Sequence, residues 1–269
     1  HIKRIFDLAY QQAELYPNNK MFVSKIEGEW KPIQPAEFID QTIQLAKGFL
    51  ALGVKPGDKV GLVCESCYQW HVVDFAIQQI GAVVVAIYPN ISDSEYEFIL
   101  TDAEINLCIV SSKNLYKRIN SLKQRVTNLQ DVFSIQQVEG ARNWSEIVEL
   151  GKTVNEQQVF ALRDAVKETD LATLIYTSGT SGQPKGVMLS HKNILSNVMA
   201  CKPRIPADHN SRVLSFLPAC HVYERMLHYL YMYLGSSIHF AVSLETIGEN
   251  MLEVKPHVFT AVPRLLEKV

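Results

Sequence analysis

The sequence predicts an α/β fold built from stacked, mostly parallel β-sheets with helices on both faces. One observation is a repeated alternation of strand-like and helix-like segments, such as 59–64, 68–80 and 82–88. A second is that the strand-like segments are apolar at consecutive positions and not at every second one. Strands with this pattern are buried on both faces, which is typical of parallel sheets covered by helices.

The elements of the first 110 residues follow in a clear order. Apolar residues at helical spacing predict helices over 2–16 and 35–52, and the segments 21–26 and 30–33 between them predict a hairpin. Ser92, with a glutamate three positions later, indicates the capped start of a further helix. The alternation predicts strands at 59–64, 82–88 and 106–110 and helices at 68–80 and 92–102.

The rest of the chain repeats the alternation after a polar stretch. Residues 111–169 have a weaker pattern, in which 131–135 is the best strand. We therefore divide the chain into a first α/β subdomain, 1–168, and a second, 169–269. The second subdomain carries predicted strands at 172–176, 187–189, 212–216, 236–240 and 257–260 and predicted helices at 190–200, 222–234, 245–254 and from Pro263 onward.

Composition and charge narrow the class of protein. The formal net charge of -2 gives no basic excess, so nothing points to a nucleic-acid partner. No apolar segment reaches the roughly 20 residues that a membrane-spanning helix needs. Five cysteines at irregular spacing argue against a disulfide framework and fit a reducing compartment. We expect a cytoplasmic protein, with peripheral contact at the inner face of the membrane left open.

The segment 176–187, YTSGTSGQPKGV, predicts a phosphate-binding loop. It joins three glycines to four small hydroxyl residues and a lysine, directly after a predicted strand. Glycines let the backbone approach a ligand closely, while N–H groups, hydroxyls and a lysine ammonium surround phosphate oxygens. The end of a strand in an α/β sheet is also where ligands usually bind.

The same loop differs from the Walker A loop of P-loop NTPases. That motif has four residues between its first glycine and the Gly-Lys-Ser/Thr segment, and it continues into a helix. Here Pro184 stands in the place of the second glycine, Gly186 stands in the place of the hydroxyl, and a strand-like segment follows. The alternative is a hairpin turn that binds no ligand, but such a turn needs neither four hydroxyls nor a lysine.

Three segments carry a resemblance to a known family. Residues 170–191, DLATLIYTSGTSGQPKGVMLSH, closely resemble the signature loop of the adenylate-forming superfamily. Residues 216–225, FLPACHVYER, and 260–268, TAVPRLLEK, are similar to stretches of bacterial long-chain fatty-acid CoA ligases. The later motifs of such enzymes are missing from these 269 residues. We therefore expect an N-terminal fragment of a longer chain, incomplete at its C-terminus and inactive alone.

The resemblance implies an AMP-forming ligase that converts ATP, a fatty acid and CoA into acyl-CoA, AMP and diphosphate through an acyl-adenylate. It implies small-molecule substrates and leaves the oligomeric state open. It assigns Mg²⁺ to Thr177. The β- and γ-phosphates of ATP fall by resemblance to Ser178, Gly179, Thr180, Ser181, Gly182 and Lys185.

Four further residues are expected in the acyl and adenylate pocket. The resemblance makes His221 the catalytic candidate beside the acyl carboxylate, with a core histidine at a helix start as the alternative. Glu224 and Arg225 form an ion pair or an anion contact beside the pocket, or else a solvated pair. Arg264 either lies near the pocket or pairs with Glu267 of its own helix.

Other interpretations stay open at this point. Helix 222–234 is apolar nearly all round, which is typical of buried core and also suits the wall of a fatty-acyl tunnel. Another adenylate-forming ligase, for an aryl or amino acid, is the nearest alternative function. A nucleotide-binding module without catalysis is the alternative from a different class.

Overall fold

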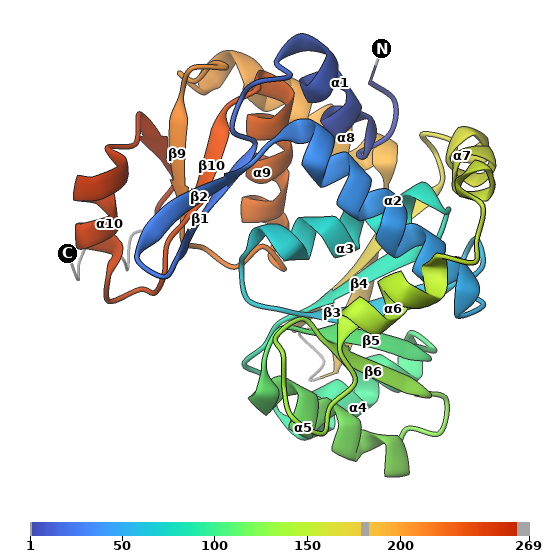
Figure 1. Cartoon of the computed structure of the whole chain (residues 1–269). Helices are drawn as coiled ribbons and strands as arrows, with labels where there is room; N and C mark the ends of the chain where they lie inside the picture. Colours follow the sequence, from blue (N-terminus) through green and yellow to red (C-terminus); the bar gives the residue numbers. More distant parts are fainter. Residues whose placement is uncertain (1, 179–182, 263–269) are drawn as a thin grey trace. The chain divides into compact units, whose positions relative to one another are not determined.

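The computed structural model describes residues 2–178 and 183–262. The chain forms two compact units, and each is assembled from separate stretches of sequence. The first unit takes His1–Asp40, Ser66–Tyr68 and Ile194–Val269, and the second takes Gln41–Glu65 and Gln69–Asn193. Figure 1 shows the elements of both units coloured along the sequence.

The first unit is built on a five-stranded sheet with the order β11-β9-β10-β1-β2. All neighbours in it are parallel except β1 and β2, which form an antiparallel hairpin at one edge. Glu27 and Gly28 turn that hairpin with φ values of 52° and 84°, as a two-residue turn of this hand requires. The elements are α1 (Asp7–Leu15), β1 (Phe22–Ile26), β2 (Glu29–Ile33), β9 (Arg212–Ser215), α9 (Val222–Leu234), β10 (Ser237–Phe240), α10 (Ile247–Val254) and β11 (Val258–Phe259).

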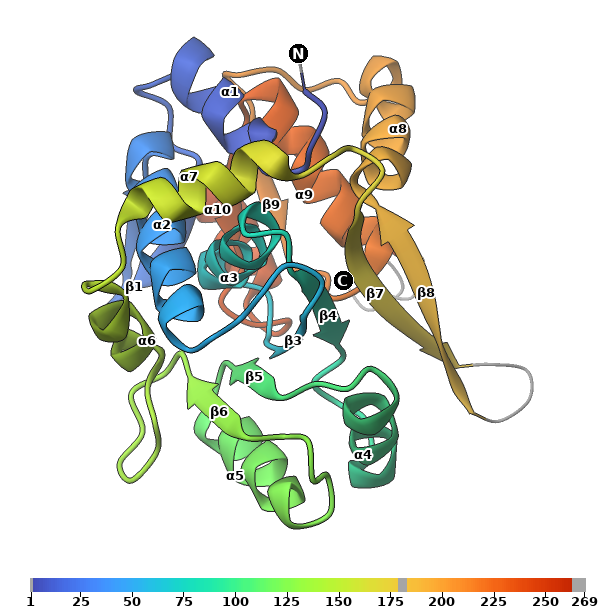
Figure 2. The ribbon, with the colours of Figure 1, turned by 90° about the vertical axis from the view of Figure 1, so that its right-hand side faces the viewer.

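The second unit is built on a six-stranded sheet with the order β6-β5-β3-β4-β7-β8. Only β8 runs antiparallel to its neighbour, so that β7 and β8 form a hairpin at the edge (Figure 2). Its elements are β3 (Lys59–Val63), β4 (Val83–Ile87), α4 (Asp93–Asp102), β5 (Leu107–Val110), α5 (Lys113–Ser121), β6 (Asp131–Ser134), α6 (Trp144–Gly151), α7 (Glu156–Ala165), β7 (Leu171–Ser178) and β8 (Pro184–Ser190).

Three helices contribute residues to both units or lie at their sequence boundaries: α2 (Pro35–Ala51), α3 (Tyr68–Gln79) and α8 (His191–Cys201). Within the second unit, α2 packs closely on α6 through glycine. A Cβ at Gly48 would lie 2.1 Å from the carbonyl oxygen of Ile147, so only a hydrogen fits there. A Cβ at Gly151 would lie 2.6 Å from the Gly48 nitrogen.

The predicted α/β class with mostly parallel sheets is confirmed, and most elements fall within a few residues of their predicted bounds. Ser92 forms the predicted capping box at the start of α4. The weak-pattern stretch 111–169 also contains three helices, α5, α6 and α7, which the sequence analysis did not predict. The last helix, predicted from Pro263, lies outside the described residues.

The grouping of the chain differs from the division predicted at residues 168 and 169. Strand β7 begins at Leu171, but it pairs in parallel with β4 and so continues the sheet of the second unit. The hairpin β1–β2 pairs instead with β10, far along the chain. Because strand pairing joins distant stretches in both sheets, neither unit is continuous in sequence.

Candidate nucleotide-binding site

The predicted phosphate loop lies at the end of the β7–β8 hairpin of the second unit. The first half of β7 is buried in the sheet, where the Thr173 hydroxyl donates a 2.6 Å hydrogen bond to the carbonyl of Val84 in β4. The second half runs beyond its pairing with β4 and is held by β8 alone. The hairpin is therefore rooted in the sheet, while its end leaves the sheet at the carboxyl side of β7 (Figure 2).

The strand register brings Thr177 opposite Lys185. Cross-strand partners project from the same face of a hairpin, so the hydroxyl and the ammonium share one face. Both residues are exposed. A hydroxyl and an ammonium that face solvent side by side form a suitable contact for an anionic oxygen.

Several predicted site residues lie outside the described part of the chain. Gly179, Thr180, Ser181, Gly182 and Arg264 belong to this group. The backbone of Ser178, the last residue of β7, is paired with that of Pro184, the first residue of β8. The phosphate contacts assigned to these residues stay predictions.

His221 occupies the N-cap position of α9 in the first unit, with φ -79° and ψ 134°. Its side chain is exposed and makes no capping hydrogen bond to the helix. The alternative of a core histidine is therefore wrong, whereas the role beside the acyl carboxylate stays a prediction. The preceding Cys220 is buried, and burial raises the pKa of its thiol to about 12, so it is a protonated thiol and not a nucleophile.

Glu224 and Arg225 are buried, each with 1% of its surface exposed, so the alternative of a solvated pair is wrong. The Ser215 hydroxyl donates to Glu224 Oε1 at 2.7 Å, and the Thr260 hydroxyl donates to Oε2 at 3.1 Å. The His228 Nε2 lies 3.1 Å from the same Oε1 and 2.7 Å from the Ser215 oxygen. We call Ser215, Glu224, His228 and Thr260 the Glu224 network.

The Glu224 network joins three elements at one end of the first unit's sheet. Ser215 is the last residue of β9, Thr260 follows β11, and Glu224 and His228 lie one turn apart on α9. Sequence reasoning placed Glu224 in the substrate pocket but missed its three partners. The spacing of four between Glu224 and His228 was the one visible signal, because such a pair shares a helix face.

The interior of α9 is core. Tyr229 and Met232 have no exposed surface, and the Arg225 Nε donates a 2.7 Å hydrogen bond to the Tyr229 hydroxyl. Exposed apolar side chains on this helix belong to its first two residues, Val222 and Tyr223. A tunnel lined by the middle of α9 stays a hypothesis, and packing accounts for the side chains found there.

The described residues contain no group of three or more His, Cys, Asp or Glu side chains arranged to hold a metal ion. Mg²⁺ in nucleotide sites commonly keeps several waters and takes most other ligands from substrate phosphates. The exposed Thr177 hydroxyl therefore fits Mg²⁺ as a single protein ligand beside bound phosphates. A Mg²⁺ ion held in this way needs no cluster of protein carboxylates.

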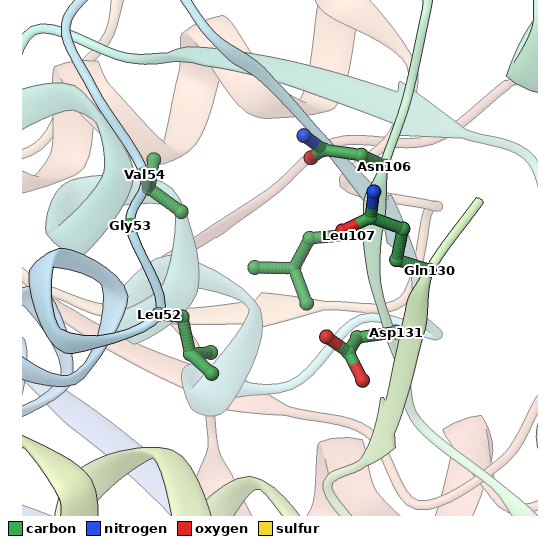
Figure 3. A pocket seen from close by; sticks show the side chains of 7 residues that line it. All are labelled: Leu52, Gly53, Val54, Asn106, Leu107, Gln130 and Asp131. Carbon is green, nitrogen blue, oxygen red and sulfur yellow. The ribbon is translucent and has the colours of Figure 1, made fainter. Parts of the chain in front are cut away.

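A small pocket lies at the opposite, amino end of the second unit's sheet (Figure 3). Asn106 precedes β5 and Asp131 opens β6, and both line it. Its volume of about 40 Å³ suits a water molecule or two and not a nucleotide. The pocket therefore does not compete with the β7–β8 hairpin as a nucleotide site.

Exposed Thr177 and Lys185, which face each other in the β7–β8 hairpin of an α/β sheet, suit a phosphate-bearing ligand such as a nucleotide. Comparison with known families makes this specific: the chain belongs to the family of AMP-binding enzymes, whose model matches residues 9–269. The resemblance to adenylate-forming enzymes found in the sequence is confirmed. Among the residues that the structure describes, no helix is long and apolar enough to cross a membrane.

Individual relatives agree with the family. The long-chain-fatty-acid–CoA ligase FadD15 of Mycobacterium bovis is 31% identical over 255 residues, which cover 94% of this chain and 42% of the relative. Long chain acyl-CoA synthetase 5 of Arabidopsis thaliana is 28% identical, with 100% of this chain and 43% of the relative covered. This chain thus spans about two fifths of the length of these curated relatives.

Solved structures show the same fold. A long-chain-fatty-acid–CoA ligase, FadD1, from Archaeoglobus fulgidus matches with a TM-score of 0.84 and 24% identity, covering 100% of this chain and 53% of that one. The N-terminal domain of FACL13 from Mycobacterium tuberculosis matches with a TM-score of 0.83 and 21% identity, covering 99% of this chain and 65% of that one.

Proposed function

We propose that this chain carries the ATP-binding part of an AMP-forming acid–thiol ligase that acts on long-chain fatty acids. The observation that carries the proposal is the pairing of exposed Thr177 and Lys185 at the end of the β7–β8 hairpin. The relatives named as long-chain-fatty-acid–CoA ligases favour a fatty acid over an aryl or amino acid as the second substrate.

In the proposed reaction, the fatty-acid carboxylate attacks the α-phosphorus of ATP, and the bond to diphosphate breaks. The thiolate of CoA then attacks the acyl carbon and releases AMP. A carboxylate is a weak nucleophile, so positioning and charge neutralisation supply most of the first step. In this proposal Lys185 neutralises charge on the β- and γ-phosphates as diphosphate departs.

We also propose roles for Mg²⁺ and for the residues of the acyl pocket. Mg²⁺, when bound, would offset negative charge on the phosphates, and Thr177 would contact it. We place His221 beside the acyl carboxylate because its side chain is exposed at the start of α9. Glu224 acts on this region through the Glu224 network and not by touching substrate, since its carboxylate is buried among protein partners. Arg225 is equally buried and donates to the Tyr229 hydroxyl, so we propose that it also acts indirectly. Arg264 remains a proposed pocket residue.

The proposal also covers the partners and the location of the enzyme. Its partners are small molecules and not nucleic acid, and we propose a cytoplasmic location with peripheral contact at the inner membrane face where long-chain substrates dissolve. We propose that these 269 residues, which span about two fifths of the relatives' length, hold the phosphates of ATP and do not complete the reaction alone.

An exchange assay tests the function directly. A full-length protein that contains this chain is incubated with ATP and labelled diphosphate, and label in ATP is measured with palmitate, acetate, benzoate or an amino acid. We expect exchange with palmitate and background exchange with the others. Exchange driven by benzoate or an amino acid would support the alternative ligases, and ATP binding without exchange by any acid would support a non-catalytic module.

A further inference from the structure

Two residues next to the phosphate contacts face away from the phosphates. Tyr176 precedes Thr177, Gly186 follows Lys185, and the register pairs Tyr176 with Gly186. Successive residues of a strand point to opposite faces, so Tyr176 and Gly186 share the face opposite Thr177 and Lys185. This face of the hairpin has contacts of its own with the rest of the second unit.

We propose that Asp102 and Tyr176 are positioning residues that hold the β7–β8 hairpin in its ATP-binding geometry, with the tyrosine ring lying across Gly186. This proposal rests on the proposed function, because it deepens the role of the hairpin. Neither side chain is proposed to touch ATP.

The hydrogen bond to Asp102 ties the hairpin to a neighbouring helix. The Tyr176 hydroxyl donates to Asp102 Oδ2 at 2.6 Å, across 74 positions of sequence. Asp102 is the last residue of α4, where the negative end of the helix dipole disfavours a carboxylate. The last turn of α4, which lies wholly in the described part of the chain, carries no basic residue to offset this. The bond from Tyr176 supplies a reason for an acidic residue at this position.

The ring of Tyr176 is fixed on both sides. A Cβ at Gly186 would lie 3.1 Å from Cζ of the ring and 3.3 Å from its hydroxyl, so the ring rests against the bare backbone of β8. The ring also packs against the buried core cluster of the second unit. Burial and the bond to Asp102 both raise the pKa of the Tyr176 phenol, so it stays protonated and remains a donor at neutral pH.

Fixing Tyr176 and Gly186 fixes the two strands at the points where the loop begins and ends. Thr177 and Lys185 are exposed, and within residues 2–178 and 183–262 they have no sheet neighbour beyond each other's strand. Their spacing and direction therefore depend on the pair of residues directly before and after them. Groups held in their binding geometry before the ligand arrives lose less conformational freedom on binding, which strengthens binding.

The test uses a full-length protein that contains this chain and its variants Tyr176→Phe, Asp102→Ala, Asp102→Asn and Gly186→Ala. Hydrogen exchange is measured for 171–178 and 184–190, and ATP affinity is measured by calorimetry. Tyr116→Phe serves as the matched control, because the Tyr116 hydroxyl contacts the Arg142 backbone nitrogen elsewhere in the same unit.

Loss of one hydrogen bond to a charged group should make Tyr176→Phe and Asp102→Ala exchange about fivefold faster in the hairpin and bind ATP about fivefold more weakly. Gly186→Ala should act in the same direction by displacing the ring. Asp102→Asn should stay near wild type, because its amide oxygen accepts the same bond, and Tyr116→Phe should leave both readouts unchanged.

Two results separate this proposal from the proposed function. Wild-type exchange and wild-type ATP affinity in Tyr176→Phe and Asp102→Ala would overturn the positioning role while leaving ATP binding intact. A wild-type chain that binds no ATP would overturn the proposed function, and faster hairpin exchange in the variants would still support the Asp102–Tyr176 contact as the support of the hairpin. An Asp102→Asn variant as damaged as Asp102→Ala would also overturn the hydrogen-bond argument.

Discussion

Replacing Glu224 with alanine should destabilise the first unit far more than replacing it with glutamine. The Glu224 carboxylate is 1% exposed and accepts hydrogen bonds from Ser215 and Thr260, with His228 Nε2 at 3.1 Å. Alanine leaves two hydroxyls and an imidazole without this acceptor, and each unsatisfied buried group costs about 1–3 kcal/mol. Ser215 and His228 still contact each other at 2.7 Å, which recovers part of the loss.

The expected cost of Glu224→Ala is therefore about 3–5 kcal/mol of unfolding free energy, in the range for breaking one side of a buried charged contact. Glu224→Gln keeps an oxygen toward Ser215 and His228 and offers an N–H to the Thr260 hydroxyl. Its expected cost is about 1 kcal/mol, since most of the hydrogen bonds survive.

Urea unfolding followed by circular dichroism measures both variants at pH 7, with equal slopes required before the free energies are compared. Glu249→Ala is the matched control, because Glu249 is 65% exposed at 3.7 Å from Lys25 in the same unit and should change stability by about 0.5 kcal/mol or less. A Glu224→Ala variant within 1 kcal/mol of wild type would refute this accounting. Equal losses for the two Glu224 variants would show that the charge matters more than the hydrogen bonds.

Three further outcomes are expected. Lys185→Ala should weaken ATP binding about 10-fold or more in calorimetry, because a charge-assisted contact is lost. Lys192 is also an exposed lysine, and Lys192→Ala should leave ATP affinity unchanged. Equal ATP affinities of the two variants would contradict the phosphate role of Lys185. Gly48→Ala should cost at least about 2 kcal/mol in urea unfolding, because its Cβ would lie 2.1 Å from the Ile147 carbonyl oxygen, and a neutral effect would contradict the close helix contact. Burial lowers the pKa of His239 to about 4 in the folded chain. Between pH 6.5 and 4 the unfolded chain therefore binds a proton at His239 that the folded chain does not. The contribution of His239 to the free energy of unfolding should fall by about 3 kcal/mol over this range as the pH drops. His239→Gln should flatten that part of the pH profile, and an unchanged slope would contradict the assignment.

The fold class was predictable because it depends on local patterns. Apolar runs alternating with helical spacing identified the parallel strands. The glycines, hydroxyls and lysine of 176–187 predicted a phosphate loop between two strands, and its phosphate contacts stay a prediction. Helix α9 was predicted with the bounds it has, since apolar residues lie nearly all round it and Gly235 ends it with φ 78°.

What could not be predicted depends on distant pairing. Helices α5, α6 and α7 are short, and their starts are marked mainly by Ser112, Asn143 and Asn155, whose caps are visible only when the following backbone is known to be helical. The discontinuous units arise because β1 pairs with β10 and β4 pairs with β7. No local pattern encodes such pairings.

The residues of the candidate site also fall into those that the sequence indicated and those that it did not. Sequence reasoning proposed Thr177, Lys185 and His221 as the groups with chemistry, from the family resemblance and from residue types that suit phosphate and carboxylate ligands, and their roles stay predictions. It missed Asp102, which lies 74 positions from Tyr176, and it did not show that Glu224 is buried. Supporting contacts of this kind are set by packing, and one sequence gives only faint signals for them, such as an aspartate at the wrong end of a helix.

The structure also explains why the signature of the hairpin extends past the residues that suit phosphate chemistry. Tyr176 and Gly186 have no evident role toward a phosphate, yet Tyr176 adjoins Thr177 and Gly186 adjoins Lys185, the two residues that we propose to face the phosphates. On the alternating faces of a two-stranded hairpin, every residue aimed at the ligand has a neighbour aimed the other way. If that neighbour is unsupported, the ligand-facing residue moves with it. A phosphate-binding hairpin that leaves its sheet therefore needs two sets of residues. Hydroxyls and a lysine face the ligand on one side, and an aromatic ring, a glycine and a distant carboxylate support the strands from the other side.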